Sequence, residues 1–591
     1  MIATNGSDGA RVVVIGGGPA GLTAAYELTR VGVRPVVLEK EASVGGLART
    51  ESYRGFHFDL GGHRFFTKIP EVEAMWRDVL GPDFVRRQRL SRIYYDGTFF
   101  HYPLRPWNAL AGFGLAQSVL VGLSYLRWQL LPYRQEETFE QWVTNRFGRR
   151  LFRMFFETYT EKVWGVSCRE LKAEWAAQRI KDLSLRSAVL SMFVRPRTTI
   201  KTLIDEFDYP RRGPGMMWNA VRARVEGAGG TVRSRAEVVS VRREGRRITG
   251  VTVAGNGGHE AVDGTDFISS MPITELVARL DPPAPPEVTR AAARLTYRDF
   301  LTVCLIVNRA QLFPDNWIYV HDPGVKVGRI QNFKNWSPDM VPDAAKTSLG
   351  LEYFCTVGDE LWRMPDADLI DLGKREIERI GLARVADVED GCVARVAKAY
   401  PVYDSAYREH LDVVRRFVDG LENLQTIGRN GLHRYNNQDH AMLTGMLAVR
   451  NLTRGERNDL WTVNTEPEYH EEITEKVLEP RVAEFFPRLD RVALAGAVGA
   501  TTGLALFLAT ITLVIKGGPV VGPTLGLLAQ YFPGYTVTPA GALLGLLYGA
   551  VVGGVAGWSF AVLRNVTLLF YVAMARRRVE RGLLRRFMEF V

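Results

Sequence analysis

"RVVVIGGGPAG", residues 11–21, joins a short β-branched run directly to a glycine-rich turn. Its glycines Gly16, Gly18 and Gly21 have the spacing G-x-G-x-x-G, and an Ala- and Leu-rich helical pattern follows them. The first glycine permits a tight turn, the second lets a backbone approach a pyrophosphate, and the third lets the helix pack on the strand. The N–H groups at the start of that helix favour phosphate. The stretch therefore predicts an α/β unit that binds a dinucleotide.

The residues after this unit indicate which dinucleotide is bound. "RPVVLEK" (34–40) reads as a second strand ending at Glu39, where a carboxylate accepts bonds from ribose hydroxyls. Beyond it, "GGLAR" (45–49) resembles the FAD-specific extension of glutathione-reductase-like flavoproteins, and no second strand–GxGxxG–helix unit for a nicotinamide cofactor follows. We therefore predict FAD in a glutathione-reductase-like Rossmann domain. The FAD-binding residues predicted here are Gly16, Gly18, Pro19, Ala20, Gly21, Glu39, Lys40, Gly46, Leu47 and Arg49.

Composition sets outer limits on the function. With 591 residues the chain is too long for one hydrophobic core, and its 24% charged and 46% hydrophobic residues are ordinary for a globular protein. The four cysteines are scattered without metal or redox spacing, so we expect reduced thiols, a cytosolic environment and no metal site. No apolar h-region precedes the first strand, so no signal peptide is expected. About half of the net charge of +10 lies after Arg564, which favours an anionic surface over nucleic acid.

A second glycine-rich stretch, "DLGGHRFFTK" (59–68), sets two glycines beside a histidine. Strands do not need a Gly-Gly pair, so another group is expected to approach this backbone closely. In flavoproteins of this kind the loop runs past the flavin. We therefore predict that Gly61 and Gly62 let the backbone reach the isoalloxazine ring and that His63 lies at its reactive edge.

The C-terminal region changes character. Residues 492–515 and 517–563 contain no charged residue, and a bilayer-spanning helix needs roughly 20 apolar residues. We predict two transmembrane spans, about 492–515 and 539–563, that form a hairpin. Arginines flank both outer ends, so the positive-inside rule puts both ends in the cytoplasm. This predicts a membrane-anchored protein whose catalytic domain is cytoplasmic.

The second predicted span carries a glycine every four residues. On a helix this spacing makes a bare stripe that another helix can approach closely. The packing partner is either the first span or a second copy of the chain, which would give a homo-oligomer. The glycines are Gly541, Gly545, Gly549, Gly553 and Gly557.

Motifs spread over about residues 10–450 resemble UDP-galactopyranose mutases, within the amine oxidase and protoporphyrinogen oxidase superfamily. The most specific is "YTEKVWG" (159–165), and "GGHRFFTK" (61–68) is similar to the mutase loop with its histidine. The other motifs are "YPRRGPGMMW" (209–218), "GRIQNF" (328–333), "AYPVY" (399–403) and "GRNGLHRYNNQDHAM" (428–442). The polar 429–440 loop and the membrane hairpin depart from the mutase pattern, so the substrate need not be UDP-galactose.

The resemblance implies roles for individual residues. It gives Arg329 the substrate pyrophosphate and gives Tyr159 and Trp164 the nucleotide part, with Arg211 as a weaker candidate for the pyrophosphate. It makes His63 and Arg329 the candidate catalytic residues. The implied substrate-binding residues are Tyr159, Trp164, Arg211, Arg329, Tyr400 and Tyr435, and the further FAD-binding residues are Gly61, Gly62, His63, Val238, Arg429, Asp439 and Met442.

Three functions stay open at this point. The first is redox-neutral chemistry at the flavin N5 on a nucleotide- or polyprenyl-diphosphate-linked sugar, with an external reductant. The second is an oxidase or dehydrogenase that removes hydride from an amine, porphyrinogen or lipid and passes electrons to an external acceptor. The basic, aromatic insert at 110–155 would then form the entry. The third is a non-enzymatic membrane scaffold.

The predicted domain organisation interleaves the FAD domain with an α+β substrate domain. Residues 1–105 form the first FAD-binding part and 106–205 a helical substrate or cap part. Residues 206–290 supply return strands to the FAD domain. Residues 291–415 form the antiparallel-sheet substrate part, 416–487 the C-terminal FAD-binding part, and 488–591 the transmembrane hairpin and basic tail.

Overall fold

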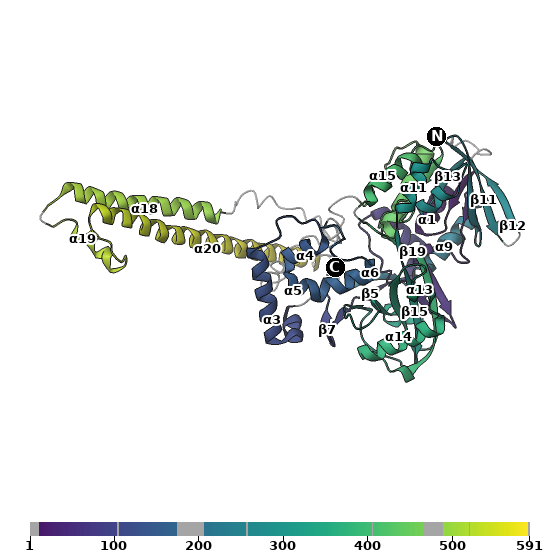
Figure 1. Ribbon diagram of the computed structural model, residues 1–591, viewed down its shortest axis with the longest axis horizontal. Coiled ribbons are helices and arrows are strands. Elements are labelled where there is room, and N and C mark those ends of the chain that lie inside the picture. Colours follow the sequence, from purple (N-terminus) through teal and green to yellow (C-terminus); the bar gives the residue numbers. More distant parts are fainter. Residues whose placement is uncertain are drawn as a thin grey trace. The chain divides into compact units, whose positions relative to one another are not determined.

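The computed structural model divides the chain into two compact units, Met1–Thr474 and Glu475–Val591 (Figure 1). We describe each unit by itself. The residues that the structure describes are 11–102, 106–173, 206–255, 258–404, 406–464, 489–518 and 520–588.

A five-stranded parallel sheet forms the centre of the FAD domain. Its strand order is β20-β13-β1-β2-β9, which is the predicted β-turn-α-β unit extended on both sides. Helices α1 (Pro19–Arg30), α9 (Gly215–Gly227) and α16 (Gln438–Arg454) share one hydrophobic core with it. The strands are β1 (Val12–Ile15), β2 (Val36–Leu38), β9 (Thr231–Arg233), β13 (Asp266–Ser269) and β20 (Leu424–Thr426).

A second, four-stranded sheet contributes to another core of the FAD domain. Alternating residues 232–254 predict antiparallel strands, and β10 (Glu237–Glu244) and β11 (Arg247–Gly255) pair in that way. The sheet is completed by β12 (Gly258–Asp263) and β14 (Leu280–Asp281), and helices α10 (Ile273–Ala278), α11 (Pro286–Arg294) and α15 (Tyr407–Val418) pack in this core. The predicted boundary at 415/416 therefore falls inside α15.

The substrate domain is built on a seven-stranded mixed sheet with the order β19-β15-β18-β17-β16-β6-β7. Strands β6 (Ser91–Tyr95) and β7 (Thr98–His101) correct the predicted 1–105 part, because β6 pairs in parallel with β16 and so belongs to this sheet. Helix α14 (Asp366–Ile380) packs in its core. The other strands are β15 (Tyr297–Val307), β16 (Trp317–Val320), β17 (Arg329–Asn332), β18 (Thr347–Cys355) and β19 (Val388–Pro401).

Two cysteines that are distant in sequence become neighbours in this sheet. Cys304 of β15 lies opposite Cys392 of the antiparallel strand β19, and both are free thiols. Sequence spacing could not show this pair, because the strand register brings the two residues together.

Short hairpins and a group of helices complete the first unit. The hairpin strands are β3 (Thr50–Tyr53) with β4 (Phe56–Asp59) and β5 (Phe84–Gln88) with β8 (Glu206–Pro210). The predicted helical cap is seen as α3 (Pro106–Leu130), α4 (Phe139–Phe147), α5 (Arg149–Phe152), a π-helical turn Arg153–Glu157 and α6 (Thr158–Trp164). The rest of the predicted cap, 174–205, lies outside the described residues. The remaining helices are α2 (Pro70–Leu80), α12 (Phe333–Trp336) and α13 (Glu360–Arg363).

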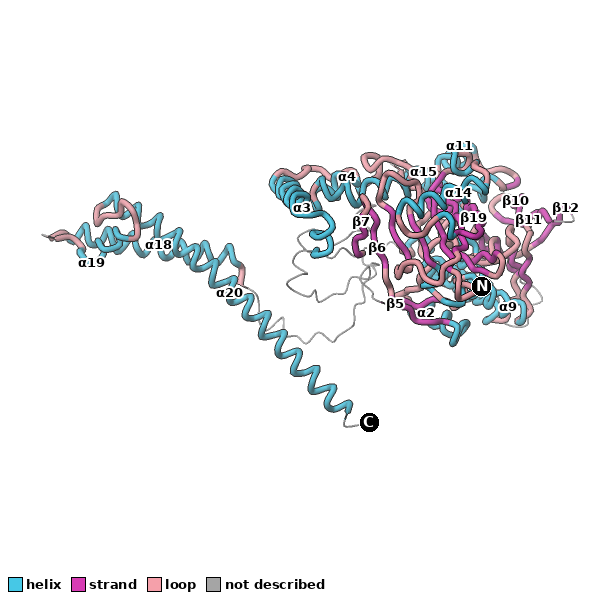
Figure 2. Tube along the Cα trace, turned by 90° about the horizontal axis from the view of Figure 1, so that it is seen from below, coloured by secondary structure: helices cyan, strands magenta, loops and turns pink. Residues whose placement is uncertain are grey.

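The second unit is a hairpin of two long helices, α18 (Arg491–Lys516) and α20 (Pro539–Met588), which lie side by side in both views (Figure 2). The short helix α19 (Pro523–Gly526) lies in the connector. Helix α20 continues beyond the predicted end at residue 563, because no proline or glycine interrupts residues 564–580.

The glycine stripe of α20 packs against α18 of the same chain. A Cβ atom on Gly549 would lie 2.9 Å from the Cα of Gly503, and one on Gly553 would overlap the hydroxyl of Thr502. That hydroxyl donates a 2.8 Å hydrogen bond to the carbonyl of Gly549. The structure therefore uses the first span as the partner, and it leaves no room for a second copy on the stripe of this hairpin.

Candidate active site

The glycine loop between β1 and α1 is tightly constrained. Gly16 has φ +99°, and a Cβ atom on it would lie 2.2 Å from Ser270 Oγ. A Cβ atom on Gly21 would lie 1.9 Å from the carbonyl oxygen of Gly16, so helix and strand can meet only through glycine. Helix α1 starts at Pro19 with Gly18 as its uncapped N-cap residue. Its first-turn N–H groups therefore remain available for an anion.

The second glycine pair lies against this loop, as its FAD-type assignment requires. The N–H of Gly45 donates to the carbonyl of Gly17 at 2.8 Å, and a Cβ atom on Gly46 would lie 3.1 Å from the Cα of Gly18. Arg49 donates to Glu51 at 2.6 Å and to the carbonyl of Gly46 at 3.2 Å, which fixes the turn. The predicted "GGLAR" element is thus part of the same backbone cradle.

Glu39 is buried at the end of β2. Its carboxylate accepts the N–H of Gly17 at 2.7 Å and the N–H of Glu41 at 2.8 Å. Burial raises the pKa of this carboxyl, and the two backbone donors oppose the shift. The acid therefore lies directly beside the glycine loop, while the neighbouring Lys40 is exposed.

The remaining predicted flavin residues come from more distant segments. Val238 is buried in β10 and its carbonyl accepts a bond from Arg279. Asp439 is buried in the first turn of α16, and one turn further Met442 accepts the indole N–H of Trp76 on its sulfur at 3.1 Å. The side chain of Met442 is therefore part of the core.

These features fit a dinucleotide. Glycines that no side chain can replace, a helix N-terminus without a cap, and a carboxylate at the end of β2 supply the donor and acceptor set that a pyrophosphate and a ribose need. The residues arise from β1, β2 and the second glycine pair, all on one side of the parallel sheet's carboxyl ends. This is where open α/β sheets bind such ligands.

Arg329 lies at the centre of the predicted substrate region. One of its terminal nitrogens lies 2.6 Å from a carboxylate oxygen of Glu352 and 3.0 Å from the hydroxyl of Tyr400. Glu352 lies opposite Arg329 on the paired strands β17 and β18 and is completely buried. The amide of Gln331 donates to the other oxygen of Glu352 at 2.8 Å. Burial alone would lower the pKa of Arg329, but the Glu352 carboxylate outweighs it and holds the pKa above its usual value.

Aromatic rings surround this arginine. Tyr400 and Tyr435 are stacked with ring centres 5.6 Å apart, and Trp164 lies 6.2 Å and 6.1 Å from them. The Arg329 guanidinium lies 5.3 Å above the ring of Phe354. Arg429 lies 4.8 Å above Tyr435, so both predicted arginines face this aromatic group.

"YTEKVWG" follows a π-helical turn. The turn Arg153–Glu157 adds an extra residue to the helical path, and such turns change which face the following residues present. Tyr159 then stacks on His321 with ring centres 4.6 Å apart and an angle of 12°. Trp164 closes the last turn against Tyr400.

His63 sits in the loop after β4. Its Nε2 lies 2.8 Å from the carbonyl of Leu60, which can only accept, so Nε2 carries the proton and Nδ1 is the acceptor nitrogen. Burial lowers the pKa of His63 to about 4, and the charges of Arg429 and Arg329 contribute. The imidazole is therefore neutral at physiological pH.

The two glycines before His63 have a reason within the protein itself. Gly61 has φ +90°, and a Cβ atom on Gly62 would lie 2.9 Å from the amide nitrogen of Gln331. The loop thus lies directly over the Gln331–Glu352 pair that holds Arg329. The sequence predicted room for a flavin here, and the structure adds close packing on the arginine's own support.

Arg211 is not part of this group. It lies in the turn after β8, where it pairs with Asp83 at 3.0 Å and with Asp339 at 3.6 Å. Its side chain is 42% exposed. The structure therefore does not bring this predicted substrate residue to Arg329.

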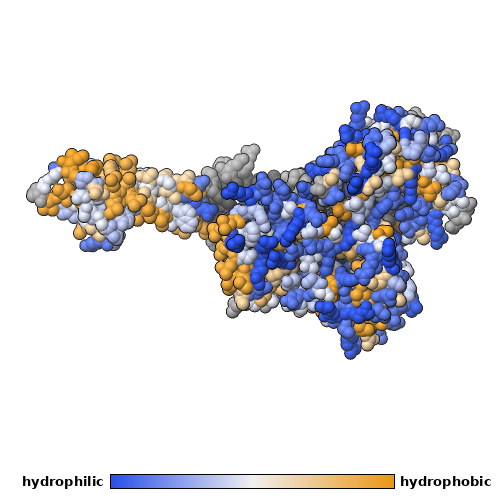
Figure 3. All heavy atoms as spheres, in the orientation of Figure 1, coloured by the Kyte–Doolittle hydropathy of each residue, from blue (hydrophilic) through white to orange (hydrophobic). Residues whose placement is uncertain are grey.

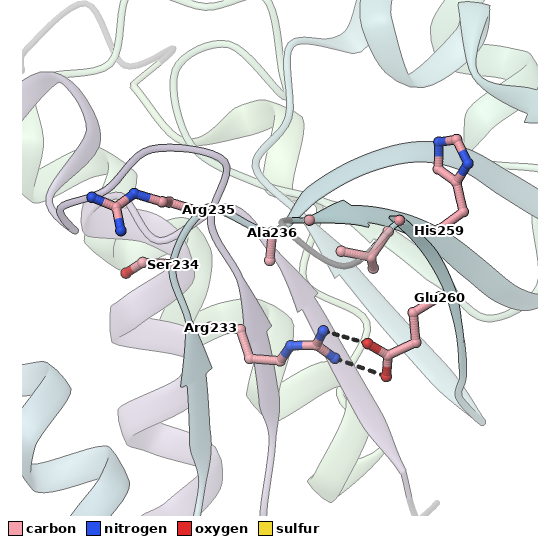
Figure 4. A pocket seen from close by; sticks show the side chains of 9 residues that line it. Arg233, Ser234, Arg235, Ala236, His259 and Glu260 are labelled. Atoms are coloured by element: carbon pink, nitrogen blue, oxygen red, sulfur yellow. Dashed lines mark hydrogen bonds and ion pairs between the residues drawn. The ribbon is translucent and has the colours of Figure 1, made fainter.

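A separate recess of about 330 Å³ lies beside β9 and β12 (Figure 4). The side chains of Arg233 and Glu260 form a two-bond ion pair on its wall, at 3.1 Å and 2.5 Å. None of its lining residues belongs to the predicted flavin or substrate set. We assign it no role in the chemistry.

Comparisons with known proteins can now be added. The sequence profile of the family described as flavin-containing amine oxidoreductases matches residues 19–452, which is well over half of the chain. The chain belongs to this family. FAD is therefore its cofactor, and the family resemblance predicted from the motifs is confirmed.

Individual relatives of this amine oxidoreductase share less. The chain is 29% identical over 292 residues to the Mycobacterium tuberculosis protein AofH, described as a flavin-containing monoamine oxidase, covering 48% of this chain and 61% of AofH. It is 48% identical over 54 residues to the inactive all-trans-retinol 13,14-reductase of Danio rerio, which is 9% of each chain. The chain thus spans less than two thirds of the length of these relatives.

Solved structures show the same fold. A reduced UDP-galactopyranose mutase has a TM-score of 0.67 and 21% identity, over 78% of this chain and 98% of the mutase. A structure described as a protoporphyrinogen oxidase from Exiguobacterium sp. 255-15 has a TM-score of 0.58 and 17% identity, over 76% of this chain and 100% of the other. At these identities the likeness establishes the mixed α/β flavoprotein fold of this amine oxidoreductase and not its substrate.

Sequence reasoning missed part of the site. Glu352 and Gln331 hold Arg329, and His321 supports Tyr159, yet none of the three was predicted. One signal was present for Glu352, because it is the single charged residue in the otherwise apolar strand "TSLGLEYFC" (347–355). A charge in a strand that is buried throughout needs a partner.

Proposed function

We propose that this flavoprotein acts, without net redox change, on a sugar joined to a diphosphate, with either a nucleoside or a polyprenyl chain on the other side. The observation that carries the proposal is the largely buried Arg329 surrounded by Trp164, Tyr400 and Tyr435, beside the His63 loop. A guanidinium bonds two phosphate oxygens at once, and aromatic faces suit bases and sugar rings.

The hydrogen bonds of Arg329 leave capacity for a ligand. One terminal nitrogen is committed to Glu352 and Tyr400. Among the described residues, none accepts a hydrogen bond from the buried Nε of this arginine. A buried donor without an acceptor costs free energy, and a diphosphate oxygen would remove that cost. The Glu352 carboxylate meanwhile keeps the guanidinium oriented and charged.

The other residues of the site orient and exclude water. His63, neutral at physiological pH, adds no positive charge, and its Nδ1 can accept a hydrogen bond. The stacked Tyr400 and Tyr435 form a flat wall on one side of Arg329. When bound, FAD supplies an N5 atom that can act as a nucleophile or accept hydride. The redox-neutral reaction needs an external reductant to prepare the flavin.

Net oxidation is the second candidate, and the family match favours it. Proteins described as monoamine oxidase and L-amino-acid oxidase match parts of this chain. In that case an amine, porphyrinogen or lipid would be oxidised and an external acceptor would receive the electrons. A buried arginine with a carboxylate partner gives a cationic amine no acceptor, which is why we place this candidate second.

The test uses full-length protein in detergent. The flavin is reduced anaerobically with dithionite, and UDP-, dTDP- and polyprenyl-diphosphate hexoses are added while the sugar ring form is followed by NMR. Ring isomerisation with the flavin remaining reduced supports the proposal, and Arg329→Ala should abolish it while Arg211→Ala does not. If only the oxidised enzyme reacts, bleaching with an amine, porphyrinogen or lipid, the proposal is wrong and the oxidase reading replaces it.

We also propose that the hairpin spans a membrane and leaves the catalytic unit in the cytoplasm. Helix α18 and the Pro539–Thr567 part of α20 are long and apolar enough, with mean hydropathies of 2.1 and 1.8. Their outward side chains support this, because large apolar residues face away from the partner helix. Those more than half exposed include Leu504, Leu508, Leu543, Leu547, Val551, Val555 and Leu563. A soluble core hairpin would bury such residues.

A further inference from the structure

Helix α3 exposes a row of large apolar side chains although it belongs to the catalytic unit. Val119, Leu123, Leu126 and Leu130 are 60%, 58%, 56% and 78% exposed. Their spacing of four, three and four residues puts them on one face of the helix. We call these four residues the α3 stripe. Figure 3 shows apolar side chains gathered over this part of the molecule.

The inner face of α3 is held by polar contacts. The hydroxyl of Ser124 accepts the backbone N–H of Arg150 at 3.1 Å, and the amide oxygen of Gln117 accepts the Arg150 side chain at 2.6 Å. Gln129 donates to the carbonyl of Asn145 at 2.7 Å. Helix α3 thus turns polar residues toward α4 and α5 and leucines outward. An ordinary surface helix has the opposite arrangement.

The charges around the stripe select one kind of surface. Residues 97–135 contain no aspartate or glutamate. Arg127 and Arg134 are exposed at the C-terminal end of the helix, next to the stacked rings of Trp128 and Tyr133. Apolar side chains flanked by arginine and amphipathic aromatic rings are the composition of helices that lie in the interface of an anionic membrane.

The chain itself keeps the stripe near a bilayer. If the proposed hairpin spans the membrane, Leu489 lies at its start, and only residues 465–488 separate it from Asn464 of the catalytic unit. Twenty-five peptide steps cannot exceed about 85 Å, however they run. A membrane surface is therefore always within reach of α3.

From these observations we infer that the α3 stripe docks the catalytic unit on the surface of an anionic lipid bilayer, as a second membrane contact besides the hairpin. The inference does not depend on the sugar chemistry. It rests on the proposed insertion of the hairpin, and the test separates the two.

The test places a nitroxide spin label on the full-length holoprotein in vesicles of phosphatidylcholine with a minority of phosphatidylglycerol. Leu126→Cys reports the stripe, Leu508→Cys reports hairpin insertion, and Glu360→Cys, with 79% of its side chain exposed on α13, is the water-exposed control. Labelled protein without these substitutions corrects for the partly exposed Cys392. Collision rates with oxygen and with a water-soluble nickel chelate measure the depth of each label.

We expect the ratio of oxygen to nickel accessibility at Leu126→Cys to exceed that at Glu360→Cys by about fivefold or more, because the label enters the acyl boundary. Adding Leu123→Glu and Leu130→Glu should return it to the control value without unfolding the protein, since both positions are exposed. A control-like ratio at Leu126→Cys overturns the inference. So does low access to both reagents, which would mean that protein covers the stripe. Insertion of the hairpin is judged separately from Leu508→Cys.

Discussion

Arg329 and Arg211 show what sequence resemblance can and cannot assign. The same resemblance gave both a place at the substrate. In the structure Arg329 is 20% exposed beside a fully buried Glu352, whereas Arg211 and its partners Asp83 and Asp339 are each about 40% exposed. Burying a charge is costly unless a partner is built in, and a surface pair is screened and contributes little. The buried partner, more than the arginine, therefore marks the site.

The largest expected effect comes from removing that partner. Glu352→Gln keeps the shape of the side chain but leaves the Arg329 guanidinium without an opposite charge. Breaking one side of a buried pair costs about 3–5 kcal/mol, so the urea midpoint for FAD release should fall accordingly. Asp83→Asn is the matched control at Arg211 and should cost less than about 1 kcal/mol. Equal shifts for the two variants would remove the distinction drawn between the arginines.

The next effect concerns ligand binding. Arg329→Lys keeps the charge but loses the planar fork, so affinity for a nucleoside diphosphate should fall by about 100-fold. Arg211→Lys should change it by less than about twofold. Calorimetric titration of each holoprotein with UDP measures both. A similar loss in the two variants would place the diphosphate near Arg211 instead.

The charge of Arg329 should also be visible through His63. An unfolded imidazole has a pKa of about 6.5, and burial with the two nearby arginines lowers the pKa of His63 to about 4 in the folded chain. Between these values the unfolded chain binds a proton that the folded chain does not. Folding stability therefore falls as the pH drops through this window.

For His63 alone this loss amounts to about 2 kcal/mol between pH 7 and pH 5. His63→Gln should remove that part of the acid destabilisation in urea unfolding at the two pH values. Arg329→Gln should shrink it, because one of the charges that lower the His63 pKa is gone, whereas Arg211→Gln should leave it unchanged. A pH dependence that His63→Gln does not alter would contradict a neutral, buried imidazole.

The smallest effect is expected for Arg211→Ala. Its two ion pairs are exposed, so the free energy of unfolding should change by less than about 1 kcal/mol. Thermal unfolding of the holoprotein measures this change. A larger loss would show that the turn after β8 depends on Arg211 for its conformation.

Local signals made most of the FAD domain predictable. The G-x-G-x-x-G spacing, Glu39 and the second glycine pair act within 40 residues of each other, and the structure brings all of them together. The antiparallel strands 232–254 and the two apolar helices were likewise readable from alternation and from length.

The rest depends on long-range pairing. Glu352 meets Arg329 because β17 and β18 pair in one register, and β6 joins the substrate sheet because it pairs with a strand more than 200 residues later. No local pattern encodes such a register. Arg211 fails for the same reason, since its motif fixes the residue type while Asp83 and Asp339 decide where its charge is used.

The uninterrupted length of α20 has a mechanical consequence. At 1.5 Å per residue its 50 residues extend about 75 Å, and the part after Thr567 accounts for about 32 Å of this. If the hairpin spans a bilayer, the arginine-rich residues 576–586 are carried on a stiff continuation of the span. A change of about 20° in helix tilt would swing the far end of this arm by about 11 Å. Bilayer thickness would then set how far from the membrane surface those arginines lie.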